Sequence, residues 1–179
     1  MRATEILRQE HRIIEGMLAV LHRAAGDLER GEQVDAEVFR QAIDFIQNFA
    51  DRYHHAKEED ALFATMEAHG FPRHGGPIGV MLSEHDEGRA HVQAMAEALG
   101  RYPDDPSARA ALIEHARGYA ELLSAHIYKE DNILYPMGDR MLPPSAQDDL
   151  LRQFEEVERG VLTEAERQRY LDMVQASKE

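Results

Sequence analysis

Residues 53–63 read YHHAKEEDALF, and residues 126–135 read HIYKEDNILY. When the two stretches are aligned with an offset of 72 residues, His54 falls on His126 and Glu58 falls on Glu130. A helix places residues i and i+4 on one face, one turn apart. Each stretch therefore presents one imidazole and one carboxylate in the same direction. That arrangement is half of a metal site, and it occurs twice.

The composition narrows the class of protein. The 179 residues suffice for one domain with an appended segment, and the formal net charge of −14 suits neither nucleic acid nor an anionic membrane surface. The absence of cysteine excludes disulfides, thiolate zinc sites, iron–sulfur clusters and cysteine catalysis. No apolar run approaches the roughly 20 residues of a transmembrane helix, and the first residues lack the apolar core of a signal peptide. We expect a soluble, cytoplasmic protein.

Apolar residues recur with helical periodicity along nearly the whole chain. Turn signals divide this pattern into four long helices, which we expect near residues 4–31, 35–70, 77–100 and 107–138. After Pro143-Pro144, Ser145 and Thr163 are candidates to cap two shorter helices. We therefore predict an all-α protein. Residues 1–140 would form an antiparallel up-down-up-down four-helix bundle, and residues 141–179 a C-terminal helical extension that packs on the bundle or forms a dimer contact.

The apolar stripe of each long helix passes through one histidine, so all four histidines are expected in the bundle core. At about 1.5 Å rise per residue, the helical hairpins bring them to a similar level. Two carboxylates left unpaired in the same core would cost several kcal/mol each, and a pair of divalent metal ions would resolve this. The predicted metal ligands are His11, His54, Glu58, His85, His126 and Glu130. Six protein ligands on two ions leave coordination positions open, which favours redox iron over closed structural zinc.

Three neighbouring side chains allow alternatives. His55 lies about 100° round the helix from His54 and pairs with Ile127 in the repeat, so we expect it at a helix interface, where it could orient a ligand. Glu15 follows His11 by one turn, and it is either an extra ligand or, as we favour, the partner of Arg89 in a buried ion pair. Tyr119 is expected in the core, with contact to a group bound at the metals as the alternative.

With these residues in place, the sequence resembles the hemerythrin-like family, the histidine-histidine-glutamate cation-binding proteins. The resemblance covers about residues 4–138 and rests on Glu10-His11, His54-x-x-x-Glu58, Glu84-His85 and His126-x-x-x-Glu130, in that order. It implies a non-haem di-iron centre of two Fe ions. Glu58 and Glu130 would be carboxylate bridges beside an oxo or hydroxo bridge, and the four histidines would be terminal ligands.

The chain departs from the oxygen-carrying hemerythrins at two places. Those proteins have a fifth histidine four residues after the ligand of the third helix, where this chain has Arg89. They also end with His-x-x-x-x-Asp, which would make Asp131 a ligand in place of Glu130. We prefer Glu130, because it matches Glu58 in the repeat. Four histidines and two glutamates are more similar to the family members linked to iron-centre repair and to nitrosative or oxidative stress.

Three functions stay open at the level of sequence. The leading one is a di-iron protein that reacts with O₂, peroxide or NO, in stress response, sensing or iron-centre supply. The second is a reversible O₂ carrier or store. The third is a metal-stapled structural or partner-binding bundle. In each case we expect a monomer or homodimer with no nucleic-acid or membrane partner, and the sequence identifies no pocket for an organic substrate.

Overall fold

The computed structural model describes residues 2–177, and every regular element in that range is a helix. The all-α prediction is confirmed. The α-helices are α1 (Ala3–Glu29), α2 (Ala36–Phe45), α3 (Ala64–Ala68), α4 (Pro77–Leu99), α5 (Pro106–Lys129), α6 (Tyr135–Met141), α7 (Pro144–Val161) and α8 (Glu164–Ala176). Three further segments are π-helical, and these are η1 (Ile46–His55), η2 (Lys57–Phe63) and η3 (Glu130–Leu134).

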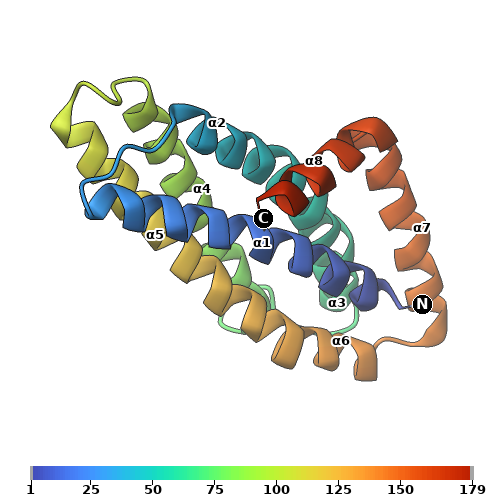
Figure 1. Ribbon diagram of the computed structural model, residues 1–179. Coiled ribbons are helices and arrows are strands. Elements are labelled where there is room, and N and C mark those ends of the chain that lie inside the picture. Colours follow the sequence, from blue (N-terminus) through green and yellow to red (C-terminus); the bar gives the residue numbers. More distant parts are fainter. Residues whose placement is uncertain (1, 178–179) are drawn as a thin grey trace.

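The π-helical segments continue the α-helices into long rods. α2, η1, η2 and α3 form one helical segment, and α5, η3 and α6 form another. Together with α1 and α4 these make four long segments that lie alongside one another (Figure 1). α5 packs against both α1 and α4, and α2 packs against the same two helices.

The helix ends follow from local sequence chemistry. After α1 the chain turns at Gly31, whose φ of 85° is the left-handed region that favours glycine. The Asp35 carboxylate caps α2 by accepting the backbone N–H of Glu37 at 2.9 Å. Pro77 is the first residue of α4, where a missing N–H costs nothing. These boundaries agree with the predicted turn signals.

Two apolar clusters lie along the long segments, one on each side of a polar layer. One cluster contains Leu21, Phe49 and Leu112, and the other contains Leu62 and Leu134. Each long segment crosses from one cluster to the other at its histidine. The polar layer is therefore sealed above and below by buried apolar side chains.

The C-terminal helices lie against the long segments. α7 contacts η1, η2 and α1, and its Leu150 and Phe154 are buried, whereas α8 contacts α1. The capping box of Thr163 and Glu166 opens α8 as predicted. The prediction that Ser145 caps α7 is wrong, because the helix begins at Pro144, whose fixed φ suits the first turn. The division into residues 1–140 and 141–179 stays a prediction. Among the described residues, no helix has both the length and the apolar character needed to cross a membrane.

Candidate metal centre

The six predicted ligands lie together in the polar layer, and each is at most 1 % exposed. With one further histidine they form two overlapping groups, and within each group the candidate ligand atoms lie within 4.8 Å of one another. Position A consists of His11, His54, Glu58 and Glu130, and position B of His55, Glu58, His85 and His126. Glu58 belongs to both positions.

The two glutamates each contact one imidazole of each position. The distances are 3.3 Å from Glu130 Oε2 to His11 Nε2, 3.2 Å from the same oxygen to His126 Nε2, 3.6 Å from Glu58 Oε1 to His54 Nε2, and 3.3 Å from Glu58 Oε2 to His85 Nε2. Ligand atoms at about 2.1 Å from one metal ion lie roughly 3.0 Å apart at right angles and roughly 3.4 Å apart in a tetrahedron. The observed spacing matches such a coordination sphere. Each glutamate therefore reaches imidazoles of both positions.

Two imidazole nitrogens approach each other at position B. His85 Nε2 and His126 Nε2 are 3.1 Å apart. Their Nδ1 atoms face carboxylate oxygens of Glu59 and Glu84 at 2.7 and 2.8 Å. Since a carboxylate accepts hydrogen bonds, both Nδ1 atoms carry hydrogen, and two uncharged rings would therefore point their Nε2 lone pairs at each other. A cation between them, a proton or a metal ion, makes this contact favourable.

Each ring at the centre has a carboxylate at its Nδ1, which fixes the tautomer that leaves Nε2 available to a metal. The pairs are His11 with Asp131, His54 with Glu10, His85 with Glu59, His126 with Glu84, and His55 with Asp51. Glu10 and Glu84 directly precede a histidine but serve the histidine of a neighbouring segment. The sequence contained both glutamates, but only the packing of the segments shows this role.

The electrostatics of the layer favour bound cations. Burial lowers the pKa of His11, but the hydrogen bond to Asp131 and the nearby Glu130 carboxylate outweigh burial and raise the pKa to about 9. Burial also lowers the pKa of His85. The carboxylates of Glu58 and Glu59 outweigh burial and raise this pKa to about 10. The same imidazoles help to hold the pKa values of Glu58 and Glu130 below their usual range against burial.

Several polar atoms of the centre have no hydrogen-bond partner among the described residues. They are His54 Nε2, Glu58 Oε2 and both carboxylate oxygens of Glu130. A buried polar atom without a partner costs about 1–3 kcal/mol, and more when it is charged. Imidazole nitrogen and carboxylate oxygen together suit divalent iron, zinc or manganese. The residues present therefore fit a metal centre.

The structure separates Glu130 from Asp131. Glu130 belongs to position A, whereas Asp131 accepts a hydrogen bond from His11 Nδ1 at 2.8 Å and pairs with Arg12. Asp131 is the counterpart of Glu59 in the 72-residue repeat, and Glu59 serves His85 in the same way. The geometry thus favours Glu130 as the ligand and gives Asp131 the task of orienting His11.

We expect Asp131→Asn to keep its bound metal with roughly 10- to 100-fold weaker affinity, as for other residues that orient a ligand. Glu130→Gln should instead remove metal. Competition titration with a chelator of known affinity measures both variants. Loss of metal from Asp131→Asn together with full retention by Glu130→Gln would reverse the assignment.

The predicted buried pair between Glu15 and Arg89 is wrong. The Glu15 side chain is 40 % exposed and pairs with Arg12 on its own helix, and Glu15 belongs to neither position. Arg89 instead donates to Asp51 and Glu59. The reason is the packing partner of α4 on this side, which is the segment of α2 and η1 rather than α1.

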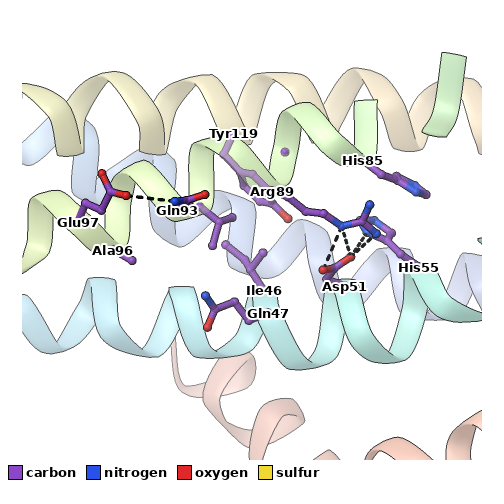
Figure 2. A pocket seen from close by; sticks show the side chains of 12 residues that line it. Ile46, Gln47, Asp51, His55, His85, Arg89, Gln93, Ala96, Glu97 and Tyr119 are labelled. Atoms are coloured by element: carbon purple, nitrogen blue, oxygen red, sulfur yellow. Dashed lines mark hydrogen bonds and ion pairs between the residues drawn. The ribbon is translucent and has the colours of Figure 1, made fainter. Parts of the chain in front are cut away.

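A cavity of about 570 Å³ adjoins position B (Figure 2). His55 and His85 line it at one end, and Arg89, Val92 and Tyr119 form part of its walls. Tyr119 is buried in the core as predicted, and its hydroxyl has no hydrogen-bond partner among residues 2–177. The cavity gives a small molecule a place beside the centre.

Sequence reasoning missed Tyr135. Its hydroxyl donates to Glu58 Oε1 and lies 3.3 Å from His11 Nε2, so it belongs beside position A. Burial raises its pKa well above 10, with further contributions from Glu130 and Glu58. The repeat contained a signal, since the counterpart of Tyr135 is the apolar Phe63.

Sequence reasoning placed His55 at a helix interface, where it could orient a ligand, and did not count it among the ligands. It assumed α-helical geometry, in which successive side chains are about 100° apart. His54 and His55 end the π-helical segment η1, where hydrogen bonds run from i to i+5 and more residues complete each turn. Successive side chains are then less than 100° apart, and both rings reach the polar layer.

Comparison with known sequences agrees with this geometry. The model of the hemerythrin HHE cation-binding domain matches residues 2–138, which is well over half of the chain. The chain belongs to this family. Both HxxxE half-sites of this chain, and all of its candidate ligands, lie within the residues that match the hemerythrin HHE model. Membership and the histidine–glutamate groups together indicate metal binding.

Three mycobacterial proteins are similar to this hemerythrin-family chain. They are the uncharacterised proteins Rv1995 and MT2051 of two Mycobacterium tuberculosis strains and Mb2018 of Mycobacterium bovis. Each is 24 % identical over 173 residues, a match that covers 96 % of this chain and 67 % of the relative.

Proposed function

We propose that this hemerythrin-family protein is a non-haem di-iron protein that reacts with O₂, peroxide or NO, in stress response, sensing or iron-centre supply. The observation that carries the proposal is the pair of overlapping ligand groups that share Glu58. The ligands common to the proposal and the sequence prediction are His11, His54, Glu58, His85, His126 and Glu130. In this proposal Glu58 and Glu130 would each help to hold both iron ions, within an antiparallel four-helix bundle.

Iron at these positions would supply electrons and open coordination positions to a diatomic or peroxide ligand. The protein residues would hold the ions, and they orient the imidazoles and bury the centre among apolar side chains. The buried ammonium of Lys57 donates a hydrogen bond to Glu10, which in turn orients His54. In the same way Lys129 donates to Glu84, which orients His126. Tyr135 keeps a proton beside position A.

The setting proposed for this chemistry is the cytoplasm, with the protein as a monomer or homodimer. Its formal net charge of −14 disfavours nucleic acid and anionic membranes as partners. Small uncharged ligands such as O₂ and NO are indifferent to that charge, and the apolar walls around the polar layer suit them.

We expect small ligands to reach position B through the cavity beside it. Ala96 is an exposed residue of α4 that lines this cavity, so Ala96→Trp should narrow it and slow the reaction of the iron-loaded protein with O₂ by roughly 10-fold, a modest steric barrier of about 1.4 kcal/mol. Ala90→Trp is the matched control, because Ala90 is exposed on the same helix outside the cavity lining. Stopped-flow absorbance at equal iron content measures both. Equal rates for the two variants would contradict this route.

A second candidate function is reversible O₂ carriage. The observation in its favour is the burial of the centre, since all seven residues of positions A and B are at most 5 % exposed. Exclusion of water and protons limits side reactions at a reactive centre.

An absorption time course separates these functions. The protein is loaded with ferrous iron without oxygen, O₂ is added, and O₂ is then removed. Irreversible conversion to a ferric spectrum supports the reactive centre, and a band that appears and vanishes reversibly supports the carrier. An unchanged ferrous spectrum would contradict both and leave iron as a structural staple. In that case redox-inert zinc should replace it with no loss of function.

A further inference from the structure

The imidazoles of positions A and B follow the internal repeat. The ring centroids of His11 and His54 are 4.7 Å apart with an interplanar angle of 57°. The ring centroids of His85 and His126 have the same separation and the same angle. Two of the carboxylate partners, Asp131 and Glu59, also correspond through the 72-residue offset. To this extent the two halves of the centre are equivalent.

His55 breaks this equivalence. Its counterpart in the repeat is Ile127, an apolar residue, so position A has no matching imidazole. The His55 ring stacks on His85 with centroids 3.8 Å apart and lies edge-on to His126 at 6.1 Å. It is therefore beside one imidazole of position B and across from the other.

We propose that His55 is a third imidazole ligand at position B, so that the centre takes five histidines and its two metal ions are chemically different. The inference rests on the proposed metal centre. It also departs from the sequence prediction, which gave His55 a supporting role at a helix interface.

The first support is the hydrogen-bond pattern. The four predicted histidine ligands each have a carboxylate at Nδ1, and His55 has one too, with Asp51 Oδ1 at 3.2 Å. Arg89 fixes that carboxylate through hydrogen bonds of 2.7 and 3.0 Å to the same oxygen (Figure 2). With Nδ1 engaged, the nitrogen left for a metal is Nε2.

The second support is the position of the ring. His55 is 5 % exposed, and one of its ring nitrogens lies within 4.8 Å of ligand atoms of Glu58, His85 and His126. That nitrogen is therefore placed to share a metal ion with the other three residues of position B.

The position of Arg89 now has a physical explanation. Arg89 anchors Asp51, which orients His55. The fifth imidazole therefore comes from η1, and Arg89 on α4 supports it through Asp51.

Proton NMR of the cobalt(II)-loaded protein tests the proposal directly. Each metal-bound imidazole with a hydrogen on Nδ1 gives one strongly shifted, exchangeable signal. We expect five such signals in the wild type and four in His55→Ile, which copies the residue of the repeat. His55→Gln is the second variant in case the apolar replacement unfolds the chain. His91→Gln is the control, since His91 belongs to neither position, and it should retain all five signals.

The stepwise metal affinities give a second readout. His55→Ile or His55→Gln should weaken one of the two binding steps by at least about 10-fold and leave the other unchanged. Two bound ions with four shifted signals in the wild type, and no change in either variant, would overturn the assignment of His55 alone. A wild-type protein that binds no cobalt(II) or iron would overturn the proposed function itself.

Discussion

Replacement of Glu58 with glutamine is expected to abolish binding of both metal ions. Glu58 is the residue shared by positions A and B, with one oxygen toward His54 and the other toward His85. A neutral amide cannot bridge two cations as a carboxylate does. The loss of affinity should exceed the roughly 100-fold that marks the upper end for residues that only orient a ligand.

Folding should survive this change. Glutamine has nearly the same shape, its Oε1 still accepts the Tyr135 hydroxyl, and the variant removes a buried charge. Asp60→Asn is the matched control, because Asp60 is an exposed acidic residue two positions further along the same segment. Elemental analysis after anaerobic loading and gel filtration counts the ions, and circular dichroism checks the fold. If Glu58→Gln binds two ions with wild-type affinity, Glu58 is not a shared bridge.

The metal-free protein should lose stability as pH rises, while its affinity for metal increases. The pKa of His11 is raised to about 9 and that of His85 to about 10. Such groups stabilise the folded chain fully below the unfolded pKa of about 6.5, and this stabilisation is lost as pH rises through about 9–10. We expect a loss of the order of a few kcal/mol, and hence a drop in melting temperature of roughly 5–10 °C, between pH 6.5 and 9.5.

Metal binding has the opposite dependence, because a metal ion must displace the protons on His11 and His85. The logarithm of the affinity should rise by about one for each pH unit and each displaced proton. The folded metal-free protein should also lose stability below pH 6.5. Because the pKa of His55 is lowered to about 3, this ring stays neutral in the folded chain while it gains a proton in the unfolded chain. Calorimetric titration in buffers of different ionisation enthalpy counts the released protons. An affinity that is independent of pH between 6 and 8 would mean that His11 and His85 carry no extra proton in the metal-free protein.

Helix positions and ligand spacing could be predicted from the sequence for a physical reason. Apolar periodicity, an Asp35 cap, a Pro77 start and a Gly100 end are local signals, and the structure places helix ends at or near each of them. The spacing of four between His54 and Glu58 survives both α- and π-helical winding closely enough to keep both side chains in the polar layer. The candidate ligands that follow this i, i+4 spacing could therefore be predicted from the sequence.

The remaining features depend on tertiary packing or on a change of helix type. The π-helical winding at His55 is a departure from α-helix that local periodicity does not encode. Arg89 was expected to face Glu15. Its partners are instead Asp51 and Glu59, because α4 packs on this side against the segment that carries them. Tyr135 is the first residue of α6. Its hydroxyl reaches His11 only because the segment of α5, η3 and α6 packs against α1.

The most direct test of a dinuclear centre is the number of iron ions that one chain binds with high affinity. The protein is loaded with excess ferrous iron without oxygen, desalted, and analysed for iron and protein together with His54→Ala. We expect two ions per wild-type chain and a lower number in the variant. A wild-type chain that retains at most one ion, or a His54→Ala chain that retains two, would contradict the dinuclear centre.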